Sequence, residues 1–279
     1  MTGTVSEALR EAAARLPATS DTARLDAELL MAHALGVSRS DLLLRHARHP
    51  VPPDFAGLID RRAAREPVAH ILGEQEFYGR PFRVTAATLI PRGDSEVLVE
   101  AALALSSPPA RVLDLGTGSG ALLLSVLAES AAEGVGTDRC TAALEVAREN
   151  ANRLGLEDRA RFELRDWHED RWVDDLGQFD LVLCNPPYVE SDAELDSDVR
   201  DYEPASALFG GTDGLDDYRA LMPQLARLLT RDSVVIFEIG AAQADAVTAL
   251  AAAEGYAVTL RRDLAGRARA LVMTRGIKR

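Results

Sequence analysis

Asp114-Leu115-Gly116-Thr117-Gly118-Ser119-Gly120 is the stretch that decides the fold. It follows the apolar run of residues 110–113 and leads into residues with the apolar spacing of a helix. Glycines at such a junction let the chain turn sharply and let a ligand approach the backbone. The order G-x-G-x-G after an acidic residue differs from the G-x-G-x-x-G of dinucleotide sites, and it favours a nucleoside such as S-adenosylmethionine. A purely structural glycine turn is the alternative.

Downstream of this stretch, segments with strand and helix patterns alternate to the end of the chain. We expect strands at residues 111–115, 134–138, 160–165, 179–184, 233–239, 256–261 and 269–274, and helices at residues 121–129, 141–154, 215–229 and 242–254. Such alternation predicts an α/β domain with a mainly parallel sheet and helices on both faces. Ligands of these domains bind beyond the carboxyl ends of the strands.

Upstream, the first 66 residues have apolar side chains at three-to-four spacing in short segments. This pattern predicts helices at residues 5–16, 21–35, 40–46 and 54–65. Residues 73–92 change character and predict a hairpin or linker that ends at Ile90-Pro91-Arg92-Gly93. The expected domains are therefore a helical domain at 1–72, the linker at 73–92 and the α/β domain at 93–279.

Composition narrows the class of protein further. The chain has 279 residues, of which 47% are hydrophobic, and no run of about 20 apolar residues that would cross a membrane. We therefore expect a cytoplasmic globular protein. Its two cysteines and five histidines have no metal-site spacing, so no metal is expected.

The negative charge is concentrated in the second part of the chain. Residues 1–75 hold 9 Arg and 10 Asp or Glu, whereas the remainder holds 22 Lys or Arg and 34 Asp or Glu. An acidic surface repels phosphate backbones, so a long nucleic-acid footprint is disfavoured and a basic protein partner suits the charge better.

Two further candidate cofactor residues stand at the ends of expected strands. Asp138 lies about twenty residues beyond the glycines, where a carboxylate can accept hydrogen bonds from ribose hydroxyls. An ordinary acidic residue before the helix near Thr141 is the alternative. Asp166-Trp167 would give the adenine one polar contact and one stacking face, unless the tryptophan is a core residue.

The sequence Asn185-Pro186-Pro187-Tyr188 directly follows the apolar strand expected at 179–184. Two prolines fix an extended turn that cannot continue a ladder, so carbonyl groups are left as acceptors. The Asn185 side-chain oxygen and the Pro186 carbonyl could each accept one N–H of a planar amide or amine, which would aim its nitrogen at a methyl sulfonium. Tyr188 would pack over the planar group. A simple strand-terminating turn is the alternative.

Residues 189–212 form a long acidic stretch without a clear periodic pattern. It carries seven acidic residues and one arginine. We interpret it as a flap that faces the substrate, with a solvated disordered loop as the alternative for its first half.

With these residues in place, the chain resembles the release factor glutamine methyltransferases over almost its full length. The resemblance rests on segments spread along the whole chain: 65–73, 76–79, 89–92 with Asp94 and Glu96, 114–120, 185–188, 202–204 with Ala207-Leu208, 213–215 with Tyr218, and 263–267. One departure is Gly93, where the family commonly has proline. The resemblance implies a class I, Rossmann-like methyltransferase domain preceded by a small all-α bundle.

The same resemblance implies the function and the site residues. The protein would transfer a methyl group from S-adenosyl-L-methionine to the side-chain amide nitrogen, N5, of the glutamine in the Gly-Gly-Gln motif of class I peptide chain release factors. The glutamine would be received by the catalytic residues Asn185, Pro186, Pro187 and Tyr188. The cofactor would be bound by Gly116, Thr117, Gly118, Ser119, Gly120, Asp138, Trp167 and Asn185.

The resemblance also implies partners, and the residues leave rival functions open. The expected protein is a monomer that docks a release factor through its helical domain and contacts neither nucleic acid nor membrane. Rival functions are a glutamine methyltransferase of a ribosomal protein, a DNA adenine-N6 methyltransferase that flips its target base, and a non-catalytic module that binds S-adenosylmethionine.

Overall fold

The computed structural model describes residues 3–275 and divides into two compact units. The first unit runs to Glu74 and also includes Leu195–Tyr202, while the second comprises Gln75–Glu194 and the chain from Glu203 onward. Residues 1–2 and 276–279, which the sequence-based division includes in the helical and α/β domains, lie outside the described residues. The segment 195–202 differs from the sequence-based division, which assigns it to the α/β domain.

The first unit is a bundle of short helices. These are α1 (Val5–Arg15), α2 (Ala23–Leu35), α3 (Arg39–Arg45), α4 (Phe55–Ala63), α5 (Val68–Leu72) and the later segment α9 (Ser197–Tyr202). At the start of α1, Thr4 and Glu7 form a capping box, in which each side chain accepts a hydrogen bond from the other's backbone N–H. The apolar faces of α1, α2 and α4 meet in one core that includes Leu9, Leu30 and Phe55.

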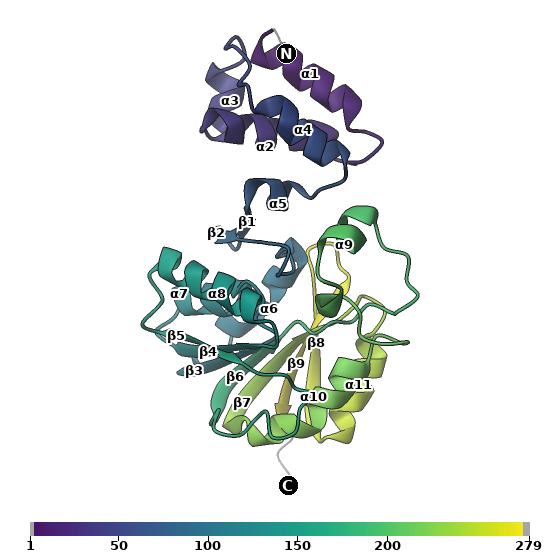
Figure 1. Cartoon of the computed structure of the whole chain (residues 1–279). Coiled ribbons are helices and arrows are strands. Elements are labelled where there is room, and N and C mark those ends of the chain that lie inside the picture. The colour runs from purple at the N-terminus through teal and green to yellow at the C-terminus, as the bar shows by residue number, and fades with distance from the viewer. Residues whose placement is uncertain (1–2, 276–279) are drawn as a thin grey trace. The chain divides into compact units, whose positions relative to one another are not determined.

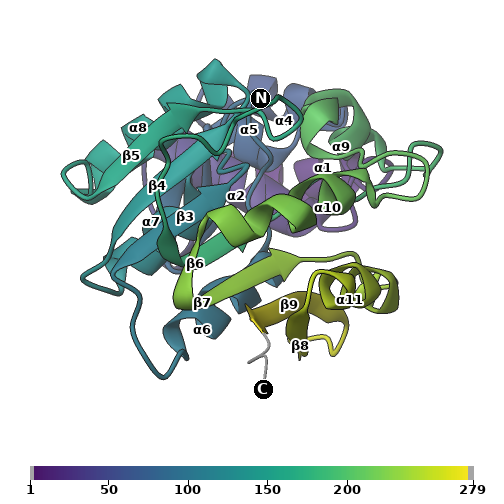
Figure 2. The ribbon, with the colours of Figure 1, turned by 90° about the horizontal axis from the view of Figure 1, so that it is seen from below.

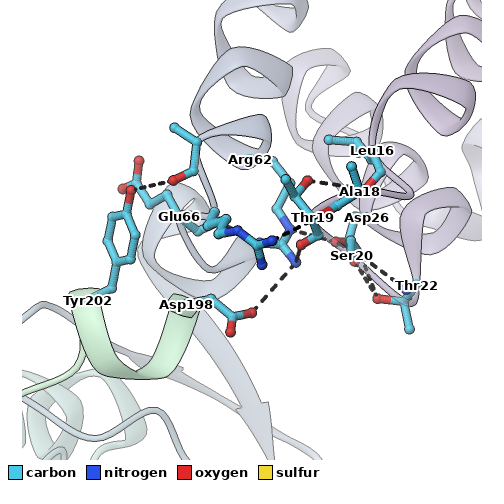
Figure 3. Close-up of polar contacts among 12 residues, drawn as sticks. Leu16, Ala18, Thr19, Ser20, Thr22, Asp26, Arg62, Glu66, Asp198 and Tyr202 are labelled. Atoms are coloured by element: carbon cyan, nitrogen blue, oxygen red, sulfur yellow. Dashed lines mark hydrogen bonds and ion pairs between the residues drawn. The ribbon is translucent and has the colours of Figure 1, made fainter. Parts of the chain in front are cut away.

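A buried ion pair ties the bundle together, as Figure 3 shows. The Arg62 guanidinium donates from Nε to Asp26 Oδ2 over 2.7 Å and from Nη2 to the Thr19 carbonyl over 3.1 Å. Asp26 also accepts the hydroxyls of Ser20 and Thr22. Because both charged side chains are almost fully buried and their hydrogen bonds are satisfied, the pair joins α2, α4 and the α1–α2 loop.

The segment α9 packs within this first unit. The Tyr202 hydroxyl donates to the Ala64 carbonyl over 2.8 Å, and Asp198 lies 3.7 Å from the Arg62 guanidinium. Residues 189–212, expected to be irregular, therefore contain a helix. Asp198 lies near Arg62, which is distant in sequence and which local patterns do not reveal, whereas Asp201 pairs with the adjacent Arg200.

Seven strands form one mainly parallel sheet in the second unit. They are β3 (Arg111–Leu115), β4 (Glu133–Asp138), β5 (Ala160–Leu164), β6 (Phe179–Cys184), β7 (Leu229–Glu238), β8 (Tyr256–Arg262) and β9 (Ala268–Arg275). Their order is β5-β4-β3-β6-β7-β9-β8, and β9 runs antiparallel to the other six strands. The predicted α/β class is confirmed. A separate small hairpin pairs β1 (Glu74–Phe77) with β2 (Arg80–Arg83).

Helices cover both faces of this sheet (Figures 1 and 2). One face packs on α6 (Glu96–Leu103), α7 (Ala121–Ala128) and α8 (Thr141–Leu154), and the other on α10 (Asp216–Leu221) and α11 (Ala244–Ala253). Leu113 and Leu183, in the central strands β3 and β6, are fully buried, as expected for parallel strands covered on both sides.

Some elements differ from the sequence-based expectation. The helix expected at 215–229 is divided into α10 and a 3-10 segment, Met222–Arg227, because Pro223 has no N–H to continue the α-helical pattern. Strand β7 begins at Leu229, earlier than expected, and neither α5 nor α6 was predicted.

Residues 3–275 contain neither a membrane-spanning helix nor a metal-binding cluster of side chains. No helix there is long and apolar enough to cross a membrane. No group of three or more His, Cys, Asp or Glu side chains there could hold a metal ion.

Replacing Arg62 with alanine is expected to destabilise the first unit by about 3 kcal/mol or more, because Asp26 keeps a buried charge without its partner. The measurement is hydrogen exchange of α2 and α4 amides in the full chain, which reports the local opening free energy. Arg15→Ala, which breaks the half-exposed pair with Asp60, is the matched control and should cost at most about 1 kcal/mol. Equal effects of the two changes would contradict the importance of the buried pair.

Candidate active site

A cavity of about 280 Å³ opens beyond the carboxyl ends of four neighbouring strands of the second unit, β5, β4, β3 and β6. The strand order reverses between β3 and β6, the place where open α/β sheets bind ligands. The lining residues after these strands are Gly116, Thr117, Gly118 and Ser119, then Asp138, Arg139 and Cys140, then Asp166, Trp167 and His168, and finally Asn185 and Pro187.

The glycine loop is built for close approach to its backbone. Gly116 and Gly118 have φ of 70° and 53°, a region that favours glycine. A Cβ at Gly116 would lie 3.1 Å from the Trp167 ring, so a side chain there would crowd the indole. At Gly118 no atom lies within 4 Å of an added Cβ, which leaves this part of the loop open to a ligand.

Asp138 connects the glycine loop to the end of β4. Its Oδ2 accepts the Gly118 N–H and its Oδ1 accepts the Cys140 N–H, each over 2.9 Å. Burial raises the pKa of this carboxyl group, while the two backbone donors act in the opposite direction. Each carboxylate oxygen has a further lone pair that can accept a hydroxyl. The hydrogen bond to Cys140, the residue before α8, also fits the alternative interpretation of Asp138 as an acidic residue at the start of that helix.

Trp167 is held in the cavity wall by a carboxylate from α10. Its Nε1 donates to Asp217 Oδ1 over 2.7 Å, and His168 Nε2 lies 2.9 Å from the same oxygen. Asp217 is buried and lines the cavity. The indole therefore has its polar edge satisfied by protein, which leaves its face for stacking.

The turn at 185–188 only partly faces the cavity. Asn185 and Pro187 line it, whereas Pro186 and Tyr188 do not. The Tyr188 hydroxyl instead donates to Glu238 Oε1 over 3.2 Å, and burial raises the pKa of this phenol, so it stays protonated. The Tyr188 hydroxyl is thus engaged with a buried carboxylate, and packing of the Tyr188 ring over a substrate amide stays a prediction.

Arg92 lines the same cavity and pairs with Glu203. Glu203 is buried, and its second oxygen accepts the Ile90 N–H over 2.9 Å. Gly93 has an ordinary negative φ and no atom within 4 Å of an added Cβ. The ion pair with Glu203 holds the Arg92 guanidinium, so glycine at position 93 does not release it.

Comparisons with known proteins agree over most of the chain. The family described as PrmC N-terminal domain matches residues 7–73, and the family described as Methyltransferase domain matches residues 106–254. A release factor glutamine methyltransferase from Cereibacter sphaeroides is 45% identical over 95% of this chain and 96% of its own length. One from Moorella thermoacetica is 42% identical over 90% of this chain and 91% of its own.

This chain belongs to the release factor glutamine methyltransferase family. It is a methyltransferase. The fold has a structural counterpart in a methyltransferase from Pyrococcus furiosus, with a TM-score of 0.55, 17% sequence identity, and coverage of 80% of this chain and 98% of that one.

Several residues of this methyltransferase site were not assigned from sequence. Asp217 and Glu238 make polar contacts with the predicted site residues Trp167 and Tyr188, and Glu203 pairs with Arg92 in the cavity wall. The family segments at 202–204 and 213–215 point to the neighbourhood of two of them, but nothing local in the sequence indicates their partners. Gly120, expected at the cofactor, starts α7 and does not line the cavity.

Asp114 lies under the glycine loop and is fully buried at the end of β3. Burial raises its pKa to about 7, against the opposing effect of a 2.6 Å hydrogen bond from the Thr117 hydroxyl. The folded protein therefore holds this proton more tightly than the unfolded chain, so its contribution to stability is complete below about pH 4 and is lost as the pH rises toward 7.

Asp114→Asn should remove this pH dependence, because an amide keeps the acceptor oxygen for Thr117 and does not ionise. The free energy of unfolding of the wild type, relative to that of the variant, should fall by roughly 4 kcal/mol between pH 4 and 8. This value follows from a pKa difference of about three units between the folded and unfolded states. Urea unfolding across this range measures it. Burial also raises the pKa of Asp138 and Glu238, so the comparison with the variant isolates Asp114. Parallel stability curves would refute the buried titration.

Proposed function

We propose that this methyltransferase uses S-adenosyl-L-methionine to methylate N5 of the glutamine in the Gly-Gly-Gln motif of class I peptide chain release factors. The observation that carries the proposal is the single cavity lined by the glycine loop, Asp138 and Asn185. The names of relatives at 40–45% identity support the choice of substrate. In this proposal the helical unit helps to dock the release factor, and the protein acts as a monomer without nucleic acid or membrane.

The residues present fit the cofactor. Gly118 leaves open space beside the loop, Asp138 offers a free lone pair on each oxygen, and Trp167 offers an aromatic face. Accordingly Asp138 would accept the ribose hydroxyls, Trp167 would contact the adenine, and residues 116–119 would contact the cofactor through their backbone. When bound, the cofactor supplies a methyl group on a positively charged sulfur.

The turn at 185–188 would receive the glutamine amide. An amide nitrogen is a weak nucleophile because its lone pair is delocalised, so positioning matters more than general base catalysis. The Asn185 side-chain oxygen and the Pro186 carbonyl would each accept one of its N–H bonds. This fixes the nitrogen and raises its electron density. Methyl transfer would form the N–C bond as the S–C bond of the bound cofactor breaks, and the nitrogen would release one proton to water.

The test is methylation of a release factor with labelled S-adenosylmethionine. Wild-type release factor should take up label at the Gly-Gly-Gln glutamine, and a variant with alanine at that position should not. Equal labelling of both substrates would contradict the assignment. Ribosomal proteins and duplex DNA are assayed in parallel, because preferential labelling of either would favour a rival function.

Asn185→Ala should lower kcat by about 100-fold or more and weaken cofactor binding by far less, because it removes the oxygen that accepts a hydrogen bond from the reacting amide. Isothermal titration measures the Kd, and initial rates on the release factor measure kcat. Normal turnover of this variant would show that Asn185 does not orient the substrate amide.

Asp138→Ala is the matched control for this difference between the effect on kcat and the effect on the cofactor Kd. It removes a carboxylate expected to bind the ribose and should weaken cofactor binding by about tenfold or more, since hydrogen bonds to charged groups are worth about 1.5–3 kcal/mol.

A further inference from the structure

The side chain of Tyr188 is fixed by a residue that does not line the cavity. Glu238 is the last residue of β7, only 2% of its surface is exposed, and its Oε1 accepts the Tyr188 hydroxyl over 3.2 Å. Burying a carboxylate is costly unless charged or polar neighbours compensate it. Tyr188 is therefore bound to a group that the fold retains at an energetic cost.

The backbone of Tyr188 is fixed by the same connection between β7 and α11. Gln243 Nε2 donates to the Tyr188 carbonyl over 3.0 Å and to the Gly214 carbonyl over 3.2 Å. Its Oε1 accepts the Gly240 N–H over 3.0 Å, which fixes the orientation of the amide group. Five residues apart in sequence, Glu238 and Gln243 thus contact the two ends of one tyrosine.

Two glycines bring a second loop directly against the turn. A Cβ at Gly210 would lie 2.4 Å from the Pro187 carbonyl oxygen, and one at Gly214 would lie 2.2 Å from the Tyr188 carbonyl oxygen. Real Cβ atoms do not approach backbone this closely, so the carbonyls of the turn pack against bare backbone. The turn therefore has contacts along Pro187 and Tyr188.

The surroundings of Glu238 indicate a role in positioning. Burial raises the pKa of Glu238, the facing groups Ser95, Arg269 and Tyr188 act in the opposite direction, and the Asp94 carboxylate adds to the rise. Neither Glu238 nor Gln243 lines the cavity. A group without access to the cavity is poorly placed to exchange a proton with a substrate.

We propose that Glu238 and Gln243 are positioning residues that hold Tyr188, and through it the turn at 185–188, in the geometry needed for methyl transfer. This inference rests on the proposed function of that turn. A displacement of about 1 Å in a reacting group can cost about 100-fold in rate, so a turn held at both ends of one residue is a sensitive point of the site.

The kinetic test compares Glu238→Gln with Glu238→Ala and Gln243→Ala. Glutamine keeps an oxygen that accepts the Tyr188 hydroxyl, so Glu238→Gln should retain kcat within about threefold, with an unchanged pH profile. The alanine variants should lose kcat by about 10- to 100-fold with little change in cofactor Kd. A Glu238→Gln variant as inactive as Glu238→Ala would overturn the proposal, because it would make ionisation of Glu238 essential.

A second readout does not depend on the substrate. The Val189 N–H, next to Tyr188, donates to the Leu208 carbonyl over 2.9 Å, and its hydrogen exchange reports the order of the turn. Exchange should accelerate at least tenfold in Glu238→Ala and Gln243→Ala and stay near the wild-type rate in Glu238→Gln. Unchanged exchange in the alanine variants would overturn the positioning role.

Ile236→Ala is the matched control for lost stability. Ile236 is fully buried in β7 and packs in the core on the α6–α8 side of the sheet, so its truncation weakens the strand without removing a polar contact to the turn. It should leave Val189 exchange and kcat per folded molecule unchanged. If Ile236→Ala changed both as much as Glu238→Ala does, Glu238 would only stabilise the fold, and the proposal would be wrong.

The failure of this inference can be distinguished from the failure of the proposed function. If wild-type protein fails to methylate any release factor, the proposed function fails, while the exchange experiment still decides whether Glu238 and Gln243 order the turn.

Discussion

The hydrogen bond from the Gly118 N–H to the Asp138 carboxylate is the contact on which the cavity depends. It joins the loop after β3 to the end of β4, and Asp138 is bound in turn by the Cys140 N–H at the start of α8. Because strands β5, β4, β3 and β6 are neighbours and parallel, their carboxyl ends lie on one edge, and each following loop contributes to one wall. The Thr117 N–H also donates to the Thr137 carbonyl of β4 over 2.8 Å, so two hydrogen bonds set the distance between the glycine loop and β4.

The elements around this edge could be predicted from sequence because their signals are local. The strands at 111–115 and 179–184 and the helix at 141–154 have the bounds expected from apolar runs and spacing. Asn185 and Asp138 could be proposed because they follow such strands. Glu238 could not, since it ends an apolar strand as one more buried position and its partner Tyr188 lies 50 residues earlier. The same holds for Asp217, which is identified only by its contact with Trp167.

The number of acidic residues in the stretch 189–212 does not reveal which of them are paired with arginines elsewhere in the chain. From sequence this stretch is interpreted as a flap that faces the substrate, with a solvated disordered loop as the alternative for its first half. In the structure Glu203 is buried against Arg92 and the Ile90 N–H, and Asp198 faces Arg62 within the helical unit. Part of the negative charge therefore has arginine partners within this chain. In chain order, residues 195–202 of the helical unit come between the turn at 185–188 and Glu203, which both belong to the second unit.

The two prolines of the turn explain why its support comes from outside. Pro186 and Pro187 have no N–H, so this part of the turn offers only acceptors and cannot be secured by its own donors. Donors and close backbone must come from elsewhere, and they do so from Gln243 at the Tyr188 carbonyl and from Gly210 at the Pro187 carbonyl. In the proposed function, support at 187 and 188 leaves the acceptors at 185 and 186 available for a substrate amide. The lack of N–H groups that suits the turn to this proposed role is also the reason why it would need Glu238 and Gln243 to hold it.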